Sequence, residues 1–260
     1  MLISSLLVFL REVLPVFFLC AMLAPLFTRE AVRSRVIGSG LGLGLLLYLC
    51  LLFFLDRLSE SMEGMGMEIL FFSVSCVQVV LFGAALATTC NWRERPLVLC
   101  LSLLLALLTM SSLVEFLTFF NSLWPQRHIR QPLVLGSIVG AGISASLSIL
   151  LYFGLYWLRS FLPLVLLVLP ALFISGRMAH AINLLAQVGL LDSDRAWSTQ
   201  HWLSDHLAVA HILTSFVGYE ATPIAWQVYG YLACLAVFLM IILARRQRLT
   251  SALVQGEEQY

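Results

Sequence analysis

The sequence predicts an all-α integral membrane protein with seven transmembrane helices. Of its 260 residues, 61% are hydrophobic and only 11% are charged, whereas soluble domains carry about 25% charged residues. The apolar residues gather into seven runs, each near the ~20 residues that a bilayer crossing needs. The net charge of +1 provides no bulk positive field, which argues against a nucleic-acid partner.

The apolar runs divide one polytopic membrane domain, residues 1–244, into its spans. The spans are expected at residues 2–27, 36–55, 69–90, 97–121, 134–158, 163–187 and 224–244. A long connection, residues 188–223, separates the sixth span from the last one. Residues 245–260 form a short tail.

The arginines set the expected orientation, because the chain contains no lysine. The connections after the first, third, fifth and seventh spans hold Arg29, Arg33, Arg35, Arg93, Arg95, Arg159, Arg245, Arg246 and Arg248. The opposite loops hold only Arg57, Arg127, Arg130 and Arg195. Since cytoplasmic loops carry the excess of basic residues, we expect a cytoplasmic C-terminal tail and an N-terminus outside.

Ionisable side chains interrupt three of the apolar spans. Arg11 and Glu12 lie in the first span, Glu115 in the fourth and Arg177 in the sixth. Each such residue costs roughly 3 kcal/mol on insertion scales, so intramembrane charges usually serve a function. We expect Glu12 and Glu115 to form a cation site near the membrane midplane, with Arg11 holding Glu12. An Arg–Glu pair that only locks two helices together is the structural alternative.

Other polar residues share a face with these groups. Ser111 and Ser112 precede Glu115 by four and three positions, which places their hydroxyls on its helix face. His180 and Asn183 follow Arg177 on roughly one face. We interpret Ser111 and Ser112 as supporting ligands of the site.

The acidic spans are the first and the fourth, which indicates two three-helix halves, residues 1–90 and 97–187. An odd number of spans in each half makes the halves inverted in the membrane. A site between inverted halves near the midplane is a recurring transporter plan.

The outer connections contain two further motifs. Residues 56–68 alternate acids with methionines, in Glu60, Met62, Glu63, Met65, Met67 and Glu68. Carboxylates favour hard cations and thioethers favour Cu(I), so this loop is a candidate for cation collection. A solvated acidic loop with methionines packing at the interface is the alternative.

The connection 188–223 contains a second polar pattern. His201 and Asp205 lie four residues apart, a spacing that suits one helix face but is weak evidence for a metal site. The periodicity from Trp202 to Phe216 predicts an amphipathic helix that lies on the outer surface or dips into it. Gly218 is expected to end this helix.

Taken together, these features resemble the high-affinity iron permeases, the oxidase-dependent iron transporters. The resemblance rests on seven spans with acids in the first and fourth, on GLLDSD after the sixth span, and on LSDHLAVAHILTSFVGYEATP before the last. The family carries Arg-Glu-x-x-Glu in its first and fourth spans, so that facing helices offer carboxylates to iron. By this resemblance Glu12 and Glu115 carry over as ligands, and Glu68 fits an outer acidic position.

The chain departs from that motif at two positions. Pro15 stands where the second acid of the first span belongs, and Ser112 stands where the first acid of the fourth belongs. Pro15 also removes a backbone donor, and we expect it to kink the first helix and free a carbonyl oxygen near Glu12.

The resemblance implies an iron permease of the bacterial inner membrane, with iron as substrate and no resident cofactor. It further implies a periplasmic iron-delivery or oxidase protein as partner, and a homo- or hetero-oligomer. Two alternatives are a transporter of copper or manganese and a non-transporting subunit that scaffolds or regulates a metal-uptake complex. An enzyme is not expected, because HExxH is absent and aspartates occur only in the loops.

Overall fold

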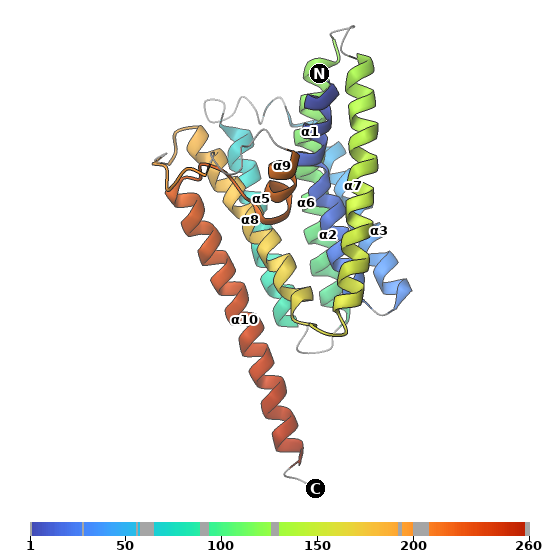
Figure 1. Ribbon diagram of the computed structural model, residues 1–260, viewed down its shortest axis with the longest axis vertical. Helices are drawn as coiled ribbons and strands as arrows, with labels where there is room; N and C mark the ends of the chain where they lie inside the picture. The colour runs from blue at the N-terminus through green and yellow to red at the C-terminus, as the bar shows by residue number, and fades with distance from the viewer. Residues whose placement is uncertain are drawn as a thin grey trace.

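The computed structural model describes residues 2–27, 29–55, 57, 65–88, 94–125, 130–191, 194–199 and 208–257. Regular structure in these ranges is helical (Figure 1). The helices are α1 (Leu2–Glu12), α2 (Leu14–Leu23), η1 (Ala24–Leu26), α3 (Glu30–Leu52), α5 (Gly66–Thr88), α6 (Glu94–Leu123), α7 (Arg130–Leu158), α8 (Val165–Gln187), α9 (Ala208–Val217) and α10 (Ala225–Glu257). Arg195 and Ile224 form an isolated antiparallel β-bridge.

The predicted seven spans are confirmed in number and approximate position. Among the described residues, seven helical stretches are long and apolar enough to cross a membrane. The largest differences are at helix starts. The second span begins at Glu30 and the fifth at Arg130, because helical structure continues into the polar residues that precede each apolar run.

The first span is broken in its middle, beside the charged pair. Helix α1 ends at Glu12 and α2 begins at Leu14, with Pro15 in the first turn of α2. Proline has no N–H and its ring clashes with the carbonyl four residues earlier, so a helix kinks or breaks there. The predicted interruption at Pro15 is therefore confirmed.

Small residues allow the closest helix pairs. Helix α3 packs along α6, and a Cβ added at Gly44 would lie 2.7 Å from the Ala106 carbonyl oxygen. Helix α7 packs along α1 and α2 through a buried stripe of Gly136, Gly140, Ser144 and Ser148. Small residues at four-residue spacing bring backbones together in membranes, where helices gain little from hydrophobic association.

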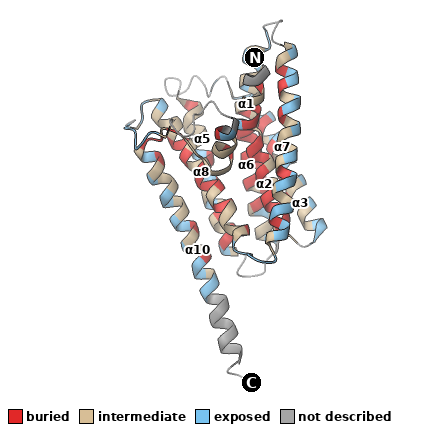
Figure 2. Ribbon diagram, in the orientation of Figure 1, coloured by how far each residue is buried: buried red, intermediate tan, exposed pale blue. Residues whose placement is uncertain are grey.

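The buried core lies on α2, α6 and α8, as the red segments in Figure 2 show. Leu14, Leu19, Leu104, Leu108 and Phe173 are almost fully buried there. The outward faces of α3, α7 and α10 instead expose large apolar side chains, which suits contact with lipid. Figure 1 shows α10 running beside α5 and α8 and extending beyond them at its C-terminal end.

Helix α9 is an interior element of the bundle. It packs against α1, α2 and α8, and Figure 1 shows it between these helices. Ala210 and Ser215 are buried, and the Phe216 ring packs edge-to-face on Phe18. Of the two positions expected from sequence, the packing against α1, α2 and α8 favours the helix that dips inward. Its described part begins at Ala208, and residues 202–207 lie outside the described residues. It ends at Val217, where Gly218 has a φ of 75°, as expected.

Candidate functional site

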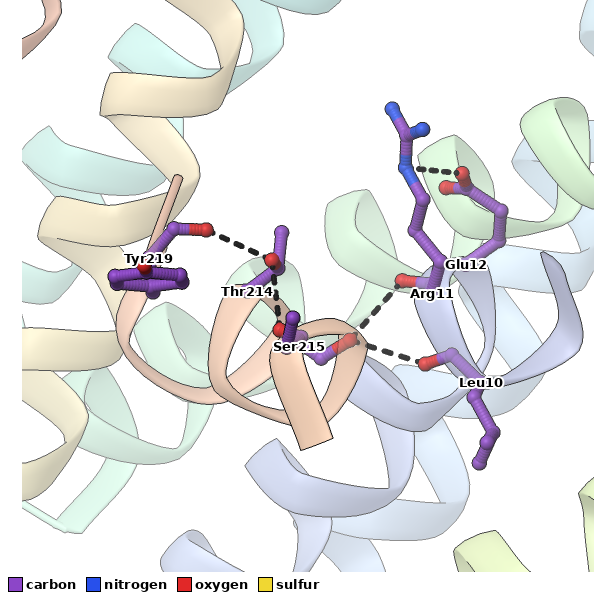
Figure 3. Close-up of polar contacts among 7 residues, drawn as sticks. Leu10, Arg11, Glu12, Thr214, Ser215 and Tyr219 are labelled. Atoms are coloured by element: carbon purple, nitrogen blue, oxygen red, sulfur yellow. Dashed lines mark hydrogen bonds and ion pairs between the residues drawn. The ribbon is translucent and has the colours of Figure 1, made fainter. Parts of the chain in front are cut away.

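Glu12 is the last residue of α1, directly before the break in the first span. Its side chain is buried, with 8% of the residue exposed. The Arg11 Nε lies 3.2 Å from Glu12 Oε1 (Figure 3). The predicted pairing of Arg11 with Glu12 is thus present in the structure.

Glu115 of α6 lies close to Glu12, although more than one hundred residues separate them in the sequence. The two carboxyl groups are within hydrogen-bonding reach of each other. Glu115 Oε2 is buried and has no hydrogen-bond partner within the described part of the chain. Two carboxyl groups this close repel each other when both are ionised, so they require a shared proton or nearby positive charge.

Arg177 of α8 supplies positive charge next to both acids. It interacts electrostatically with Glu12 and with Glu115, and its Nε is buried without a hydrogen-bond partner among the described residues. His180, three residues further along α8, interacts electrostatically with Glu115. The sequence marked Arg177 as an intramembrane charge but did not place it in this site.

A small cavity lies beside Glu12, Arg177 and His180, and Glu115 is not among the residues that line it. It has a volume of about 20 Å³ and its lining residues are Arg11, Glu12, Gly176, Arg177, His180, Thr214 and Ser215. A cavity needs about 10–15 Å³ to hold one water molecule. The space therefore suits one water or one dehydrated ion, whereas a hydrated ion would require the helices to move apart.

Helix α9 contacts the break in the first span through a hydroxyl group. Ser215 Oγ lies 3.0 Å from the Leu10 carbonyl oxygen and 3.4 Å from that of Arg11 (Figure 3). In a continuous helix the Arg11 carbonyl would accept from the N–H of residue 15, which proline lacks. The predicted free carbonyl near Glu12 is real, and the structure places the Ser215 hydroxyl against it.

Replacing Ser215 by Ala should lower the free energy of unfolding by about 1–3 kcal/mol, because a buried carbonyl loses its donor. The loss should shrink in a Pro15→Ala background, where a backbone N–H becomes available. Chemical unfolding in detergent measures the loss of stability in the parent and in the Pro15→Ala background. Ser111→Ala is the matched control, since the buried Ser111 hydroxyl bonds its own helix at Leu108. Equal losses in the parent and in the Pro15→Ala background would contradict this account.

The predicted supporting residues occupy different environments. Ser111 Oγ donates to the Leu108 carbonyl at 3.0 Å, so its hydroxyl is used within α6. Ser112 Oγ and Glu68 Oε2 are buried without partners among the described residues. Met65 and Met67 lie at the start of α5. Glu60, Met62 and Glu63 lie outside the described residues, as do His201 and Asp205.

The described side chains contain no cluster of three or more His, Cys, Asp or Glu residues arranged to hold a metal ion. Glu12 and Glu115 are a pair of acidic side chains that the described structure brings together.

A second polar cluster lies where α8 meets the start of α10, and sequence reasoning missed it. The Glu220 carboxylate accepts from Asn183 Nδ2 at 3.0 and 3.1 Å and from Gln227 Nε2 at 2.7 Å. The available signal was an acid directly after Gly218-Tyr219, with amides on the two flanking spans. Amides seldom mark a site by themselves, so the pattern was not distinctive.

Comparison of the chain with protein-family models, with curated proteins and with solved structures finds no match.

Proposed function

We propose that this protein is a permease that moves a metal cation, iron by the resemblance above, across the bacterial cytoplasmic membrane. One observation carries the proposal: Glu12 and Glu115, from the first and fourth spans, lie within hydrogen-bonding reach inside the bundle. Carboxylate oxygens suit hard cations such as iron and manganese. Acids inside a membrane-spanning bundle are rare and usually mark an ion or substrate pathway.

Arg177 acts as the counter-charge of the empty site in this proposal. Its positive charge acts on both carboxyl groups and lowers the cost of holding two acids together. A bound dication would take over this role, so we expect Arg177 to matter most when the site is empty.

The helix pairing supports the inverted arrangement of two three-helix halves. The second span packs along the fourth, as α3 on α6, and the fifth packs along the first, as α7 on α1 and α2. Swapping the two halves turns the pair of spans two and four into the pair of spans five and one, as a repeated arrangement requires. The arginine distribution supports an external N-terminus and a cytoplasmic C-terminus.

Metal uptake into proteoliposomes that contain only this protein tests the proposal. Iron(II), copper(I) and manganese(II) are offered separately, which identifies the metal. We expect iron uptake that falls at least tenfold in both Glu12→Gln and Glu115→Gln. Glu30→Gln is the matched control because the Glu30 side chain is 88% exposed. Unchanged uptake in the double variant would overturn the proposal.

The second candidate function is a non-transporting subunit of a metal-uptake complex. It is favoured by the charge balance of the site, since Arg11 and Arg177 offset the two carboxylates without any metal. An oxidase or iron-delivery protein would then be the partner whose complex this subunit scaffolds. Absence of uptake by the parent protein for all three metals would support this candidate.

A further inference from the structure

Outside the carboxyl site, a pocket of about 440 Å³ lies between α8, α10 and the turn after α9. Most of its lining is apolar, from residues such as Ala179, Val228 and Leu232. The polar side chains Glu220 and Gln227 line the same pocket. The pocket thus offers a long apolar wall with polar groups at one place, the usual form of a small-molecule site.

Three amide hydrogen bonds orient the Glu220 carboxylate. Asn183 of α8 approaches both oxygens, and Gln227 of α10 donates to Oε2 at 2.7 Å. The donors come from two different helices, so the carboxylate is held in place as α8 and α10 pack together. A carboxylate fixed in this way is preorganised to receive a positively charged donor.

Gln227 provides the second, independent observation. Only 4% of this residue is exposed, and its Oε1 has no hydrogen-bond partner among the described residues. Exchanging the oxygen and nitrogen of the Gln227 amide does not solve this. Oε1 would then face the Glu220 carboxylate, which accepts hydrogen bonds and cannot donate one. A buried acceptor without a donor costs about 1–3 kcal/mol, and a donor inside the pocket would remove that cost.

Aromatic residues complete the lining. Trp197, Tyr219 and Tyr231 border the pocket, and aromatic faces attract ammonium groups. Exposed Trp226 and Tyr229 lie in the same first turns of α10, and such residues are enriched at the level of the lipid headgroups. The aromatic residues around the pocket are thus of the kind found at the level of the lipid headgroups, where amphiphilic molecules are abundant.

We propose that this pocket binds a primary ammonium group carried on an apolar chain. The ammonium donates to the Glu220 carboxylate and to Gln227 Oε1, and the chain lies against the apolar wall. A primary ammonium has three donors, which suits two converging acceptors and an aromatic border. The ligand is either a free alkylamine or the headgroup of an aminophospholipid.

Calorimetric titration of the full-length protein in phosphatidylglycerol nanodiscs tests this proposal, with hexylammonium as the probe. Empty nanodiscs supply the baseline for binding to the lipid itself. We expect saturable binding that weakens at least tenfold in Glu220→Gln, and no comparable binding of hexanol, which has the same chain without the charge. Glu30→Gln, which removes an exposed carboxylate far from the pocket in sequence, should bind like the parent.

Val228→Trp is the second variant, because it fills the pocket while keeping Glu220 and its hydrogen bonds. It should also lose hexylammonium binding. Equal binding by the parent and both variants, or equal binding of hexanol and hexylammonium, would overturn the proposal.

Nanodiscs in which phosphatidylethanolamine replaces part of the phosphatidylglycerol, compared with nanodiscs in which phosphatidylcholine replaces the same part, distinguish the two sources of the amine. Both replacements dilute the anionic charge equally, so a weaker apparent affinity for hexylammonium with phosphatidylethanolamine means that its headgroup competes for the pocket and supports the lipid as ligand. Equal affinity in the two supports a free amine. The titration requires no transport, so its outcome is separate from that of the metal-uptake experiment.

Discussion

Replacing Arg177 by Met is expected to lower the free energy of unfolding by about 1–3 kcal/mol, the usual range for a destabilising substitution, because two facing acids lose a nearby positive charge. The substitution nearly preserves side-chain length but leaves Glu12 and Glu115 facing each other with one guanidinium fewer. Adding Glu115→Gln removes the excess negative charge, so the double variant should recover most of the loss. Chemical unfolding in detergent, read by circular dichroism, measures the parent, both single variants and the double variant.

Arg33→Met is the matched control for this experiment. Arg33 contacts Tyr152 and exposed Glu30, and exposed ion pairs contribute only about 0–1 kcal/mol. Additive effects of Arg177→Met and Glu115→Gln would show that the two residues do not interact. In that case Arg177 is not the counter-charge of the carboxyl pair.

Replacing Gly218 by Ala is expected to cost about 2–5 kcal/mol, the sum of left-handed backbone strain and an overpacked contact. Gly218 has a φ of 75°, and its added Cβ would lie 2.5 Å from the Gly176 Cα. The contact is backbone against backbone, so no side chain can rotate away. The variant should push the end of α9 from α8 and draw Ser215 away from the break beside Glu12.

Gly189→Ala separates the two contributions. Gly189 has a φ of 78°, but an added Cβ there meets nothing within 4 Å. Its cost should therefore be only the strain, about 1–2 kcal/mol. If both variants lose the same stability in detergent unfolding, the Gly176–Gly218 contact is not tight and α9 is not held by it.

Much of the membrane fold was predictable because each span is a local property of the sequence. A run of about 20 apolar residues meets the bilayer requirement whatever surrounds it, so the spans were located to within several residues. The break at Pro15 was predictable for the same reason, since proline acts on its own turn. Pairing of Arg11 with Glu12 follows from their adjacency.

The remaining features depend on which helices pack against each other, and those contacts cannot be derived from a single sequence. Arg177 reaches the carboxyl pair only because α8 lies beside the break in the first span. The periodicity of α9 was visible, yet its burial depends on the glycine contact between Gly176 and Gly218. The Glu220 cluster joins two spans through amides, and neither amide is unusual within its own helix.

The small-residue face of α7 has a mechanical consequence. Gly136, Gly140, Ser144 and Ser148 repeat every four residues, or about 6 Å along the axis. Phe9 of the first span is seated at one of these positions, because a Cβ added at Gly140 would lie 2.9 Å from the Phe9 Cβ. A side chain seated in a hollow must leave it before its helix can slide. This contact therefore fixes the axial position of the segment that carries Glu12.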